Sequence, residues 1–241
     1  MSPFTAELVG TMILVLLGDG VVANVLLNKS KGQNAGWIVI TTGWGLAVAV
    51  AIYAVGTISQ GHLNPAVTIG LAAIGKFPWA SVPAYLCAQM IGAFLGAALV
   101  WLAYLPHWKE TTDAGAKLGV FCTAPGVRNL PANLLTEIIG TFVLVLGALA
   151  IPAKNNLSVE LGFSTGLGPL LVGLLVFSIG LSLGGPTGYA INPARDLGPR
   201  LAHFFLPIAG KGNSDWHYAW VPVIGPIIGG VLGAVFYKLV W

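Results

Sequence analysis

Residues 61–68 read GHLNPAVT, and residues 188–196 read GYAINPARD. Each stretch lies between long apolar segments and is followed by a helical pattern of only about ten residues, whereas a helix needs about 20 residues to cross the ~30 Å hydrocarbon core of a bilayer. Asn is a favoured helix N-cap, and Pro is a favoured first helical residue. The two copies therefore predict two half-helices that enter a membrane without crossing it.

The repeated Asn-Pro-Ala triplet also predicts a chemical role. If the side-chain oxygen of each Asn caps its own helix, the amide nitrogen remains free to donate a hydrogen bond outward. A helix N-terminus carries about half a positive charge, so two ends that face each other repel cations and offer hydrogen bonds to neutral polar molecules. Ordinary turns are the alternative, and two copies in matching positions argue against it. The pore-forming triplets are Asn64, Pro65 and Ala66, and Asn192, Pro193 and Ala194.

The composition is typical of a polytopic membrane protein. Only 8% of the 241 residues are charged and 56% are hydrophobic, whereas soluble domains have about 25% charged residues. The net charge of +3 is small and scattered, which gives no nucleic-acid footprint. Cys87 and Cys122 show no metal-ligand spacing. We therefore expect a lipid bilayer as surroundings, no nucleic-acid partner, no metal and no cofactor.

Hydropathy predicts six full spans and two copies of one unit. Each copy has three spans and one half-helix, and residues 6–11 and 91–97 match residues 136–141 and 228–234. Because three crossings are an odd number, the second copy is inverted relative to the first. We predict an all-α membrane protein and a single channel domain over 1–241, with repeats 1–105 and 132–241 joined by a connecting loop, 106–131. The predicted spans are approximately 4–28, 36–57, 80–104, 132–152, 167–184 and 218–240.

Two further features concern the packing and the connecting loop. The pairs Gly92/Gly96 and Gly229/Gly233 have the GxxxG spacing that lets helix backbones approach closely. The connecting loop is longer than most connections, so it is either disordered or a folded element at the mouth of the pore.

The paired triplets, the inverted halves and a Glu near the start of each half are similar to the aquaporin family over essentially the whole chain. Residues 188–200 resemble the glycerol facilitator branch, the aquaglyceroporins, whose second motif continues as Asn-Pro-Ala-Arg-Asp with a basic residue four positions later, here Arg200. Pro222 followed by Val223 also resembles that branch.

This resemblance implies a selectivity filter made of Trp44, Gly180, Tyr189 and Arg195. Tyr189 stands where the branch usually has Phe, and its hydroxyl either narrows the filter or adds a polar contact. Two aromatic faces would hold the carbon backbone of a polyol, while Arg195 binds its hydroxyls. Backbone carbonyls would continue the polar side of the pore from Arg195 to the two Asn residues. They are the carbonyls of Gly61, His62, Leu63, Gly188, Tyr189 and Ala190.

The remaining intramembrane charges each have two interpretations. For Glu7 and Glu137, hydrogen bonds that hold the two loops are favoured over a proton relay. Asp196 is expected to brace its loop rather than to contact substrate. The ring of His62 is either packed and neutral or a titrating gate. Asp19 has no partner that the sequence identifies.

The sequence as a whole predicts a passive channel for glycerol and similar small neutral solutes, with some water and without ions or protons. The alternatives are a water-selective channel, a channel for undissociated acids such as lactic acid, and a proton-coupled carrier that cycles Glu7 or Glu137. An enzyme is not expected, since no nucleophile with a base, metal cluster or phosphate loop occurs. The resemblance further implies a homotetramer, and the short termini are compatible with a bacterial plasma (inner) membrane.

The resemblance also implies a cytoplasmic N-terminus. Most cationic residues of the connections then lie outside, which is opposite to the positive-inside rule. The outer cations are Lys29, Lys31, Lys109, Lys117, Arg128, Arg200 and Lys211.

Overall fold

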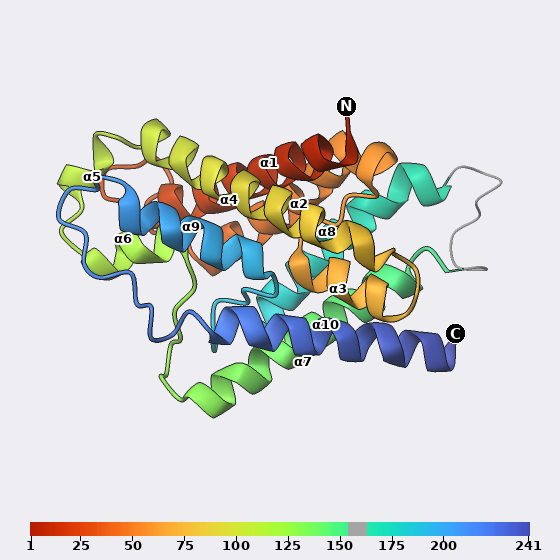
Figure 1. The fold of residues 1–241 in the computed structure, drawn as a ribbon. Coiled ribbons are helices and arrows are strands. Elements are labelled where there is room, and N and C mark those ends of the chain that lie inside the picture. The colour runs from red at the N-terminus through yellow and green to blue at the C-terminus, as the bar shows by residue number, and fades with distance from the viewer. Residues whose placement is uncertain (154–162) are drawn as a thin grey trace.

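The computed structural model describes residues 1–153 and 163–241. Within these residues, every regular element is a helix, and six helices are long and apolar enough to cross a membrane. Figure 1 shows them as a bundle with both termini toward one end. The long helices are α1 (Pro3–Leu26), α2 (Trp37–Ser59), α4 (Val82–Ala103), α7 (Leu130–Ala150), α8 (Phe163–Leu183) and α10 (Val221–Val240).

Two shorter helices follow the Asn-Pro-Ala triplets. Helix α3 (Pro65–Ala73) has 9 residues and α9 (Pro193–Phe205) has 13. At 1.5 Å per residue, neither crosses a bilayer core of about 30 Å. The prediction of six spans and two half-helices in an all-α fold is confirmed.

The observed helix ends follow from local capping. Helix α7 begins at Leu130, two residues before the predicted start, because the Asn129 side chain accepts a hydrogen bond from the backbone N–H of Ala132 at 3.2 Å. Pro131 occupies the first turn, where its missing N–H costs nothing. Ser2 caps α1 in the same way through the Thr5 N–H at 3.2 Å.

The segment between the two halves is folded. It contains α5 (His107–Glu110) and α6 (Ala114–Phe121), and both lie at the end of the bundle away from the termini (Figure 1). Asp113 caps α6, and the buried Trp108 ring stacks on Phe121 with ring centres 5.5 Å apart. The Asn28 N–H donates to the Thr111 hydroxyl at 2.9 Å, which ties the segment to the end of α1.

Two glycines let the helices of each half pack backbone to backbone. A Cβ at Gly92 of α4 would lie 2.2 Å from the Leu8 carbonyl oxygen of α1, and a Cβ at Gly229 of α10 would lie 2.3 Å from the Ile138 carbonyl oxygen of α7. Figure 1 shows α7 and α10 side by side. The same close approach therefore builds both halves.

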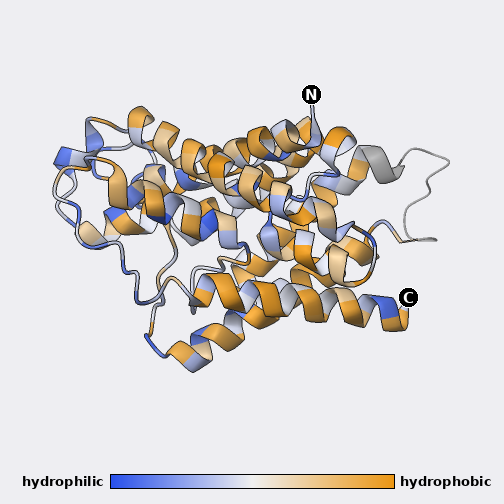
Figure 2. Ribbon diagram, in the orientation of Figure 1, coloured by the Kyte–Doolittle hydropathy of each residue, from blue (hydrophilic) through white to orange (hydrophobic). Residues whose placement is uncertain are grey.

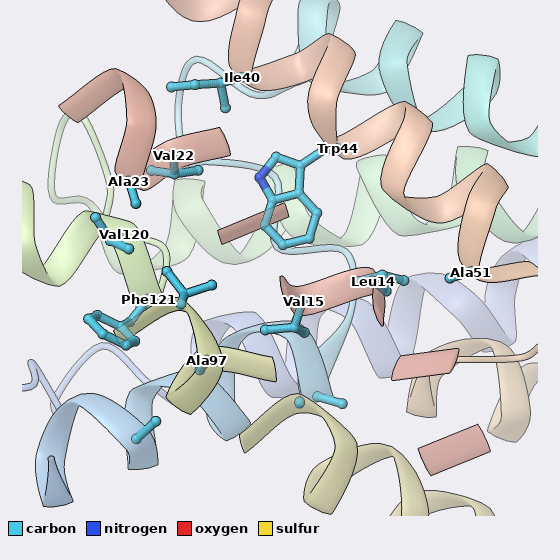
Figure 3. Close-up of a cluster of buried hydrophobic side chains, with 14 of the residues drawn as sticks. Leu14, Val15, Val22, Ala23, Ile40, Trp44, Ala51, Ala97, Val120 and Phe121 are labelled. Atoms are coloured by element: carbon cyan, nitrogen blue, oxygen red, sulfur yellow. The ribbon is translucent and has the colours of Figure 1, made fainter. Parts of the chain in front are cut away.

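Apolar side chains both fill the bundle and cover its outside. Figure 2 shows hydrophobic residues along the long helices and hydrophilic residues gathered at the end that carries α5 and α6. Inside, Leu14, Val15, Ala97 and Phe121 belong to a buried cluster that also contains Trp44 (Figure 3). Such an exterior requires lipid, so the protein is a multi-pass membrane protein.

Candidate functional site

The loops that lead into the two half-helices share one backbone conformation. Leu63 and Ile191, each directly before its Asn, have positive φ angles of 52° and 43°. This region is rare for residues other than Gly and rarer still for a β-branched residue such as Ile. Surrounding contacts must hold the chain in this form. The matching pairs of positive φ are Gln60 and Gly188, Gly61 and Tyr189, and Leu63 and Ile191.

The two Asn residues cap their own helices and reach across to the opposite loop. Asn64 Oδ1 accepts from the Ala66 N–H at 2.9 Å, and Asn192 Oδ1 accepts from the Ala194 N–H at 3.0 Å. Their amide nitrogens donate to the carbonyls of Ile191 and Leu63, both at 2.8 Å. Because a side-chain amide has two N–H donors, each Asn keeps a second donor beyond this cross-link. The two half-helices therefore meet at their positive ends.

Glu7 holds the first loop from α1. One carboxylate oxygen accepts from the Ser59 hydroxyl at 2.6 Å and from the His62 N–H at 3.0 Å. The other accepts from the Leu63 N–H at 2.7 Å and from the Gln89 amide at 2.8 Å. All four bonds are buried, so this carboxylate satisfies polar groups that no water reaches.

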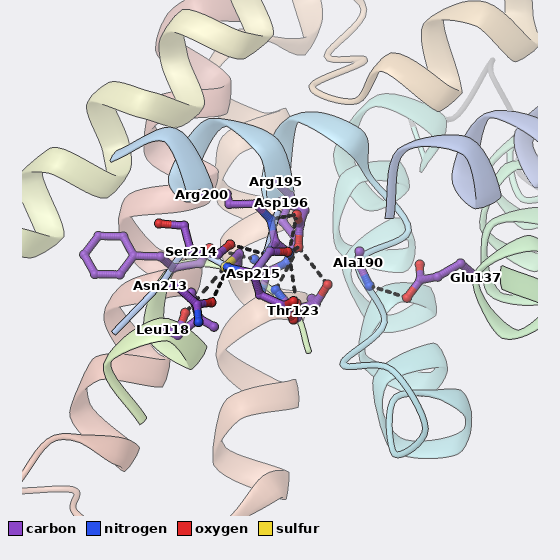
Figure 4. Close-up of polar contacts among 12 residues, drawn as sticks. Leu118, Thr123, Glu137, Ala190, Arg195, Asp196, Arg200, Asn213, Ser214 and Asp215 are labelled. Carbon is purple, nitrogen blue, oxygen red and sulfur yellow. Dashed lines mark hydrogen bonds and ion pairs between the residues drawn. The ribbon is translucent and has the colours of Figure 1, made fainter. Parts of the chain in front are cut away.

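Glu137 holds the second loop from α7 with the same geometry. It accepts from the Thr187 hydroxyl at 2.7 Å, from the Ala190 N–H at 3.0 Å and from the Ile191 N–H at 2.8 Å. Figure 4 shows the bond from Ala190 to Glu137. Both carboxylates thus occupy the loop-holding position that the sequence favours over a proton relay.

Asp196 lies in the first turn of α9 and attaches this helix to the segment that connects the two halves. It accepts from the backbone N–H and hydroxyl of Thr123 at 2.8 and 2.7 Å, and it forms a salt bridge of 2.8 Å with Arg200. Arg200 is fully buried and also donates to the Ser214 carbonyl at 2.8 Å (Figure 4). The two charges compensate each other and attach α9 to the segments around it.

Three of the four predicted filter residues line one cavity. The cavity has a volume of about 540 Å³ and is lined by Trp44, Tyr189 and Arg195, and also by Asn64 and Asn192. The Arg195 guanidinium lies 4.1 Å from the centre of a Trp44 ring and donates to the Phe121 carbonyl at 3.3 Å. The cavity therefore joins aromatic faces to hydrogen-bond donors. Of the predicted carbonyl positions, Gly61, His62, Leu63 and Ala190 also line it.

The other two predicted residues, Gly180 and Gly188, are not among the described residues that line this cavity. A Cβ at Gly180 would lie 2.8 Å from Cζ of the Tyr189 ring, so Gly180 provides the space for that ring. Gly188 has a φ of 81° and a Cβ there would lie 3.2 Å from the Thr123 methyl carbon. Both glycines therefore shape the loop rather than the cavity surface.

The Tyr189 hydroxyl is buried and has no hydrogen-bond partner among the described residues. The ring makes an edge contact with Trp37, whose indole N–H donates to the Gly180 carbonyl at 3.0 Å. A buried oxygen neither offers a hydrogen bond to a solute in the cavity nor projects into its path. Tyr189 therefore lines the cavity without its hydroxyl.

The ring of His62 is packed rather than open to the cavity. Its Nδ1 lies 3.1 Å from the Thr68 hydroxyl, and its ring centre lies 4.7 Å from that of Phe77 and 5.0 Å from that of Tyr85. The side chain is 6% exposed. This geometry corresponds to the packed interpretation.

Sequence reasoning missed several residues of the site. The Ile191 carbonyl receives the Asn64 amide, and its equivalence to Leu63 before the other Asn could have identified it. Gln89, Thr123 and Phe121 act through side-chain or backbone contacts with residues far away in the chain, and no local pattern marks them. Asp19, left without a partner by the sequence, lies 3.6 Å from Arg195.

Comparisons with known proteins show the family of this chain. The family model "Major intrinsic protein" matches residues 1–237. A probable glycerol uptake facilitator protein of Thermotoga maritima is 68% identical, covering 99% of both chains. A glycerol uptake facilitator protein of Bacillus subtilis is 61% identical over 99% of this chain and 84% of its own. The X-ray structure of the aquaglyceroporin from Plasmodium falciparum aligns with a TM-score of 0.85 at 32% identity, covering 98% and 95% of the two chains. The chain belongs to the major intrinsic protein family, the family of the aquaporins.

Proposed function

We propose that this protein is a passive channel for glycerol and similar small neutral solutes, with some water, and that it excludes ions and protons. The observation that carries the proposal is that one cavity is lined by Trp44, Tyr189 and Arg195 together with the two capping Asn residues. The names of the relatives from Thermotoga and Bacillus support the same substrate.

The chemistry of this cavity suits a polyol. A solute with a carbon backbone and hydroxyl groups can place its carbon atoms against the two aromatic faces and its hydroxyls toward the guanidinium of Arg195. The second N–H of each Asn and the carbonyls of the loops then continue the hydrogen bonds that the solute loses when it leaves water. A solute without hydroxyls would displace water from the polar groups of the cavity without replacing its hydrogen bonds, which is costly away from water.

The alternatives are less well supported. A water-selective channel agrees less with Gly180, Asp196 and Arg200, which follow the glycerol facilitator pattern. A proton-coupled carrier would need Glu7 or Glu137 to cycle its proton, yet both carboxylates accept the backbone N–H groups that keep the loops in place. Passage of undissociated acids such as lactic acid would use the same pore and would rise as the pH falls.

The same proposal covers site, assembly and location. The site residues are the two triplets, the filter set and the loop carbonyls, with Glu7, Glu137 and Asp196 as support. We further propose a homotetramer with one pore per subunit in the plasma membrane of a bacterium, with the N-terminus in the cytoplasm. The repeats 1–105 and 132–241 form one channel domain that catalyses no reaction.

The test is stopped-flow light scattering on proteoliposomes, with water efflux and glycerol entry measured on the same preparation. We expect both fluxes to exceed those of protein-free vesicles, and we expect glycerol entry to rise linearly with its gradient. Fast water flow without glycerol entry would replace this proposal with a water channel, and uphill accumulation would replace it with a carrier.

The variant Gly180→His sharpens the test at the filter. The Tyr189 ring already occupies the space beside Gly180, and a Cβ there would lie 2.8 Å from that ring, so an imidazole must displace the ring within the filter. We expect it to suppress glycerol entry while water flow survives, and the surviving water flow shows that the variant has folded. Equal loss of both fluxes in a monodisperse preparation would argue against a filter at this position.

A further inference from the structure

The two halves of the channel differ in charge at two pairs of equivalent positions. Arg195 stands three residues after Asn192, and the equivalent residue three after Asn64 is Val67. On the first helix of each half, Asp19 stands twelve residues after Glu7, and the equivalent residue after Glu137 is Leu149. The oppositely charged residues Asp19 and Arg195 therefore correspond to two apolar residues, Leu149 and Val67.

The structure brings Asp19 and Arg195 together and places their two apolar counterparts against one cluster. Asp19 Oδ1 lies 3.6 Å from a guanidinium nitrogen of Arg195, and their side chains are 0% and 8% exposed. Val67 and Leu149 both pack against one small cluster that contains Val145. The ion pair and the apolar pair thus take the same place in the two halves, which indicates that Asp19 and Arg195 depend on each other.

Asp19 has no other use in the described part of the chain. Neither carboxylate oxygen has a hydrogen-bond partner there, and the side chain does not line the cavity. Arg195 in turn forms an ion pair with no other described carboxylate, because Asp196 is occupied by Arg200 and Thr123. Among the described residues, Arg195 is therefore the cation with which Asp19 forms an ion pair.

The neighbouring residue supports the same part of the filter. A Cβ at Gly18 would lie 2.2 Å from Cζ3 of Trp44, so the indole lies directly against α1 at this point. The Trp44 ring in turn lies beneath the guanidinium of Arg195. Two adjacent residues of α1 thus contact the predicted filter. Gly18 lies against the Trp44 ring, and Asp19 pairs with Arg195.

We propose that Asp19 is a positioning residue and counter-ion that holds the Arg195 guanidinium and cancels much of its charge in the filter. The guanidinium N–H groups remain available to hydroxyls, while the filter loses the positive potential that would draw anions into it. The channel thereby discriminates between neutral solutes and small anions, and cation exclusion is left to the two helix ends. This inference rests on the proposed function and adds a selectivity that glycerol transport alone does not require.

The experiment compares anion leakage with glycerol entry in proteoliposomes. Nitrate is the probe, because it stays ionised at all working pH values. Asp19→Asn keeps the shape of the side chain and removes its charge, and Glu110→Gln removes one exposed charge that pairs with Lys29 outside the filter. We expect nitrate flux to rise about tenfold in Asp19→Asn, which corresponds to about 1.4 kcal/mol, and to stay at the native level in Glu110→Gln.

The double variant Asp19→Leu/Arg195→Val introduces the residue types that occupy the equivalent positions, Leu149 and Val67. We expect nitrate flux to return to the native level in this variant and its melting temperature in detergent to exceed that of Asp19→Leu alone, because no buried charge is left unpaired. If Asp19→Asn does not fold, recovery of folded protein in the double variant still demonstrates the pairing.

Two outcomes would overturn the inference. One is a folded Asp19→Asn variant with native nitrate flux. The other is a double variant that passes as much nitrate as Asp19→Asn, or whose melting temperature does not exceed that of Asp19→Leu. A native channel without glycerol entry would overturn the proposed function instead, and this is distinguishable because the nitrate comparison does not use glycerol.

Discussion

The two re-entrant loops have the same backbone but are attached to the protein by different chemistry. Four residues after its Asn, the first half-helix has Thr68, which is 3.0 Å from the Gln89 amide and is otherwise bonded to neutral groups. At the same place the second half-helix has Asp196, whose partners are Thr123 and the fully buried Arg200. The first attachment is neutral and the second is ionic.

This difference separates what builds the pore from what makes it selective. The features common to both loops are the capping Asn, the carboxylate below it and the left-handed residue before it, and these set the backbone. The features confined to the second loop are charged, and they include Arg195, which faces the cavity. A duplicated backbone can therefore carry an unsymmetrical filter.

The largest expected effect comes from removing the carboxylates that both loops share. Glu137→Ala leaves the N–H groups of Ala190 and Ile191 buried without an acceptor, and each such group costs about 1–3 kcal/mol. Glu7→Ala does the same to the first loop and also removes one of the two hydrogen bonds of the Gln89 amide. We expect both variants to lose folded protein, measured as the monodisperse fraction in size-exclusion chromatography. Glu110→Ala is the matched surface control, and a normal yield for either intramembrane variant would contradict the shared anchoring role.

The second prediction tests the difference between the attachments. Asp196→Asn leaves Arg200 buried without its counter-ion, which costs about 3–5 kcal/mol. Thr68→Val removes neutral hydrogen bonds, at about 1 kcal/mol each. Thermal unfolding in detergent should therefore show a much larger drop for Asp196→Asn. Similar drops for the two variants would mean that the ionic attachment contributes no more than the neutral one.

The third prediction tests the close helix packing at Gly92 and Gly229, which is the same in both halves. Alanine at Gly92 or Gly229 places a methyl group within about 2.3 Å of a backbone oxygen, and such overpacking costs about 1–3 kcal/mol. We expect the two variants to lower the melting temperature by similar amounts. Gly20→Ala on α1 is the control, because a Cβ there meets nothing within 4 Å. A clear inequality between the two halves would show that only one helix pair is close-packed.

The smallest expected effect is that of Tyr189→Phe. The hydroxyl is buried without a partner, so its removal changes stability by about 1 kcal/mol at most and in the favourable direction. Glycerol and water fluxes in proteoliposomes should both stay near the native values. A large change in the ratio of the two fluxes would show that the hydroxyl contacts the solute after all.

The charge distribution explains why a simple count of cations opposes the family orientation. Lys29 pairs with Glu110, Arg128 with Asp215 and Arg200 with Asp196. Lys211 donates to three backbone carbonyls near the end of α9. These cations are bonded within the folded loops, whereas the positive-inside rule concerns the charges of short connections as the chain is inserted.

The sequence by itself determined the architecture of this protein. Spans are apparent from hydropathy because a bilayer demands about 20 apolar residues for each crossing. The half-helices are apparent from Asn-Pro because capping is a local property of adjacent residues. The duplicated Glu and the inversion of the halves are likewise contained in residues that can be aligned with one another, whereas the filter residues follow from the resemblance to a family and stay a prediction.

Only the tertiary structure decided which groups meet. Asp19 and Arg195 come from different halves, and so do Asn64 and the Ile191 carbonyl that it binds. The Tyr189 hydroxyl is buried because Gly180 and Trp37, from two other helices, enclose its ring. Such partners carry no periodic or local signal, since they are fixed by the packing of helices distant in the chain.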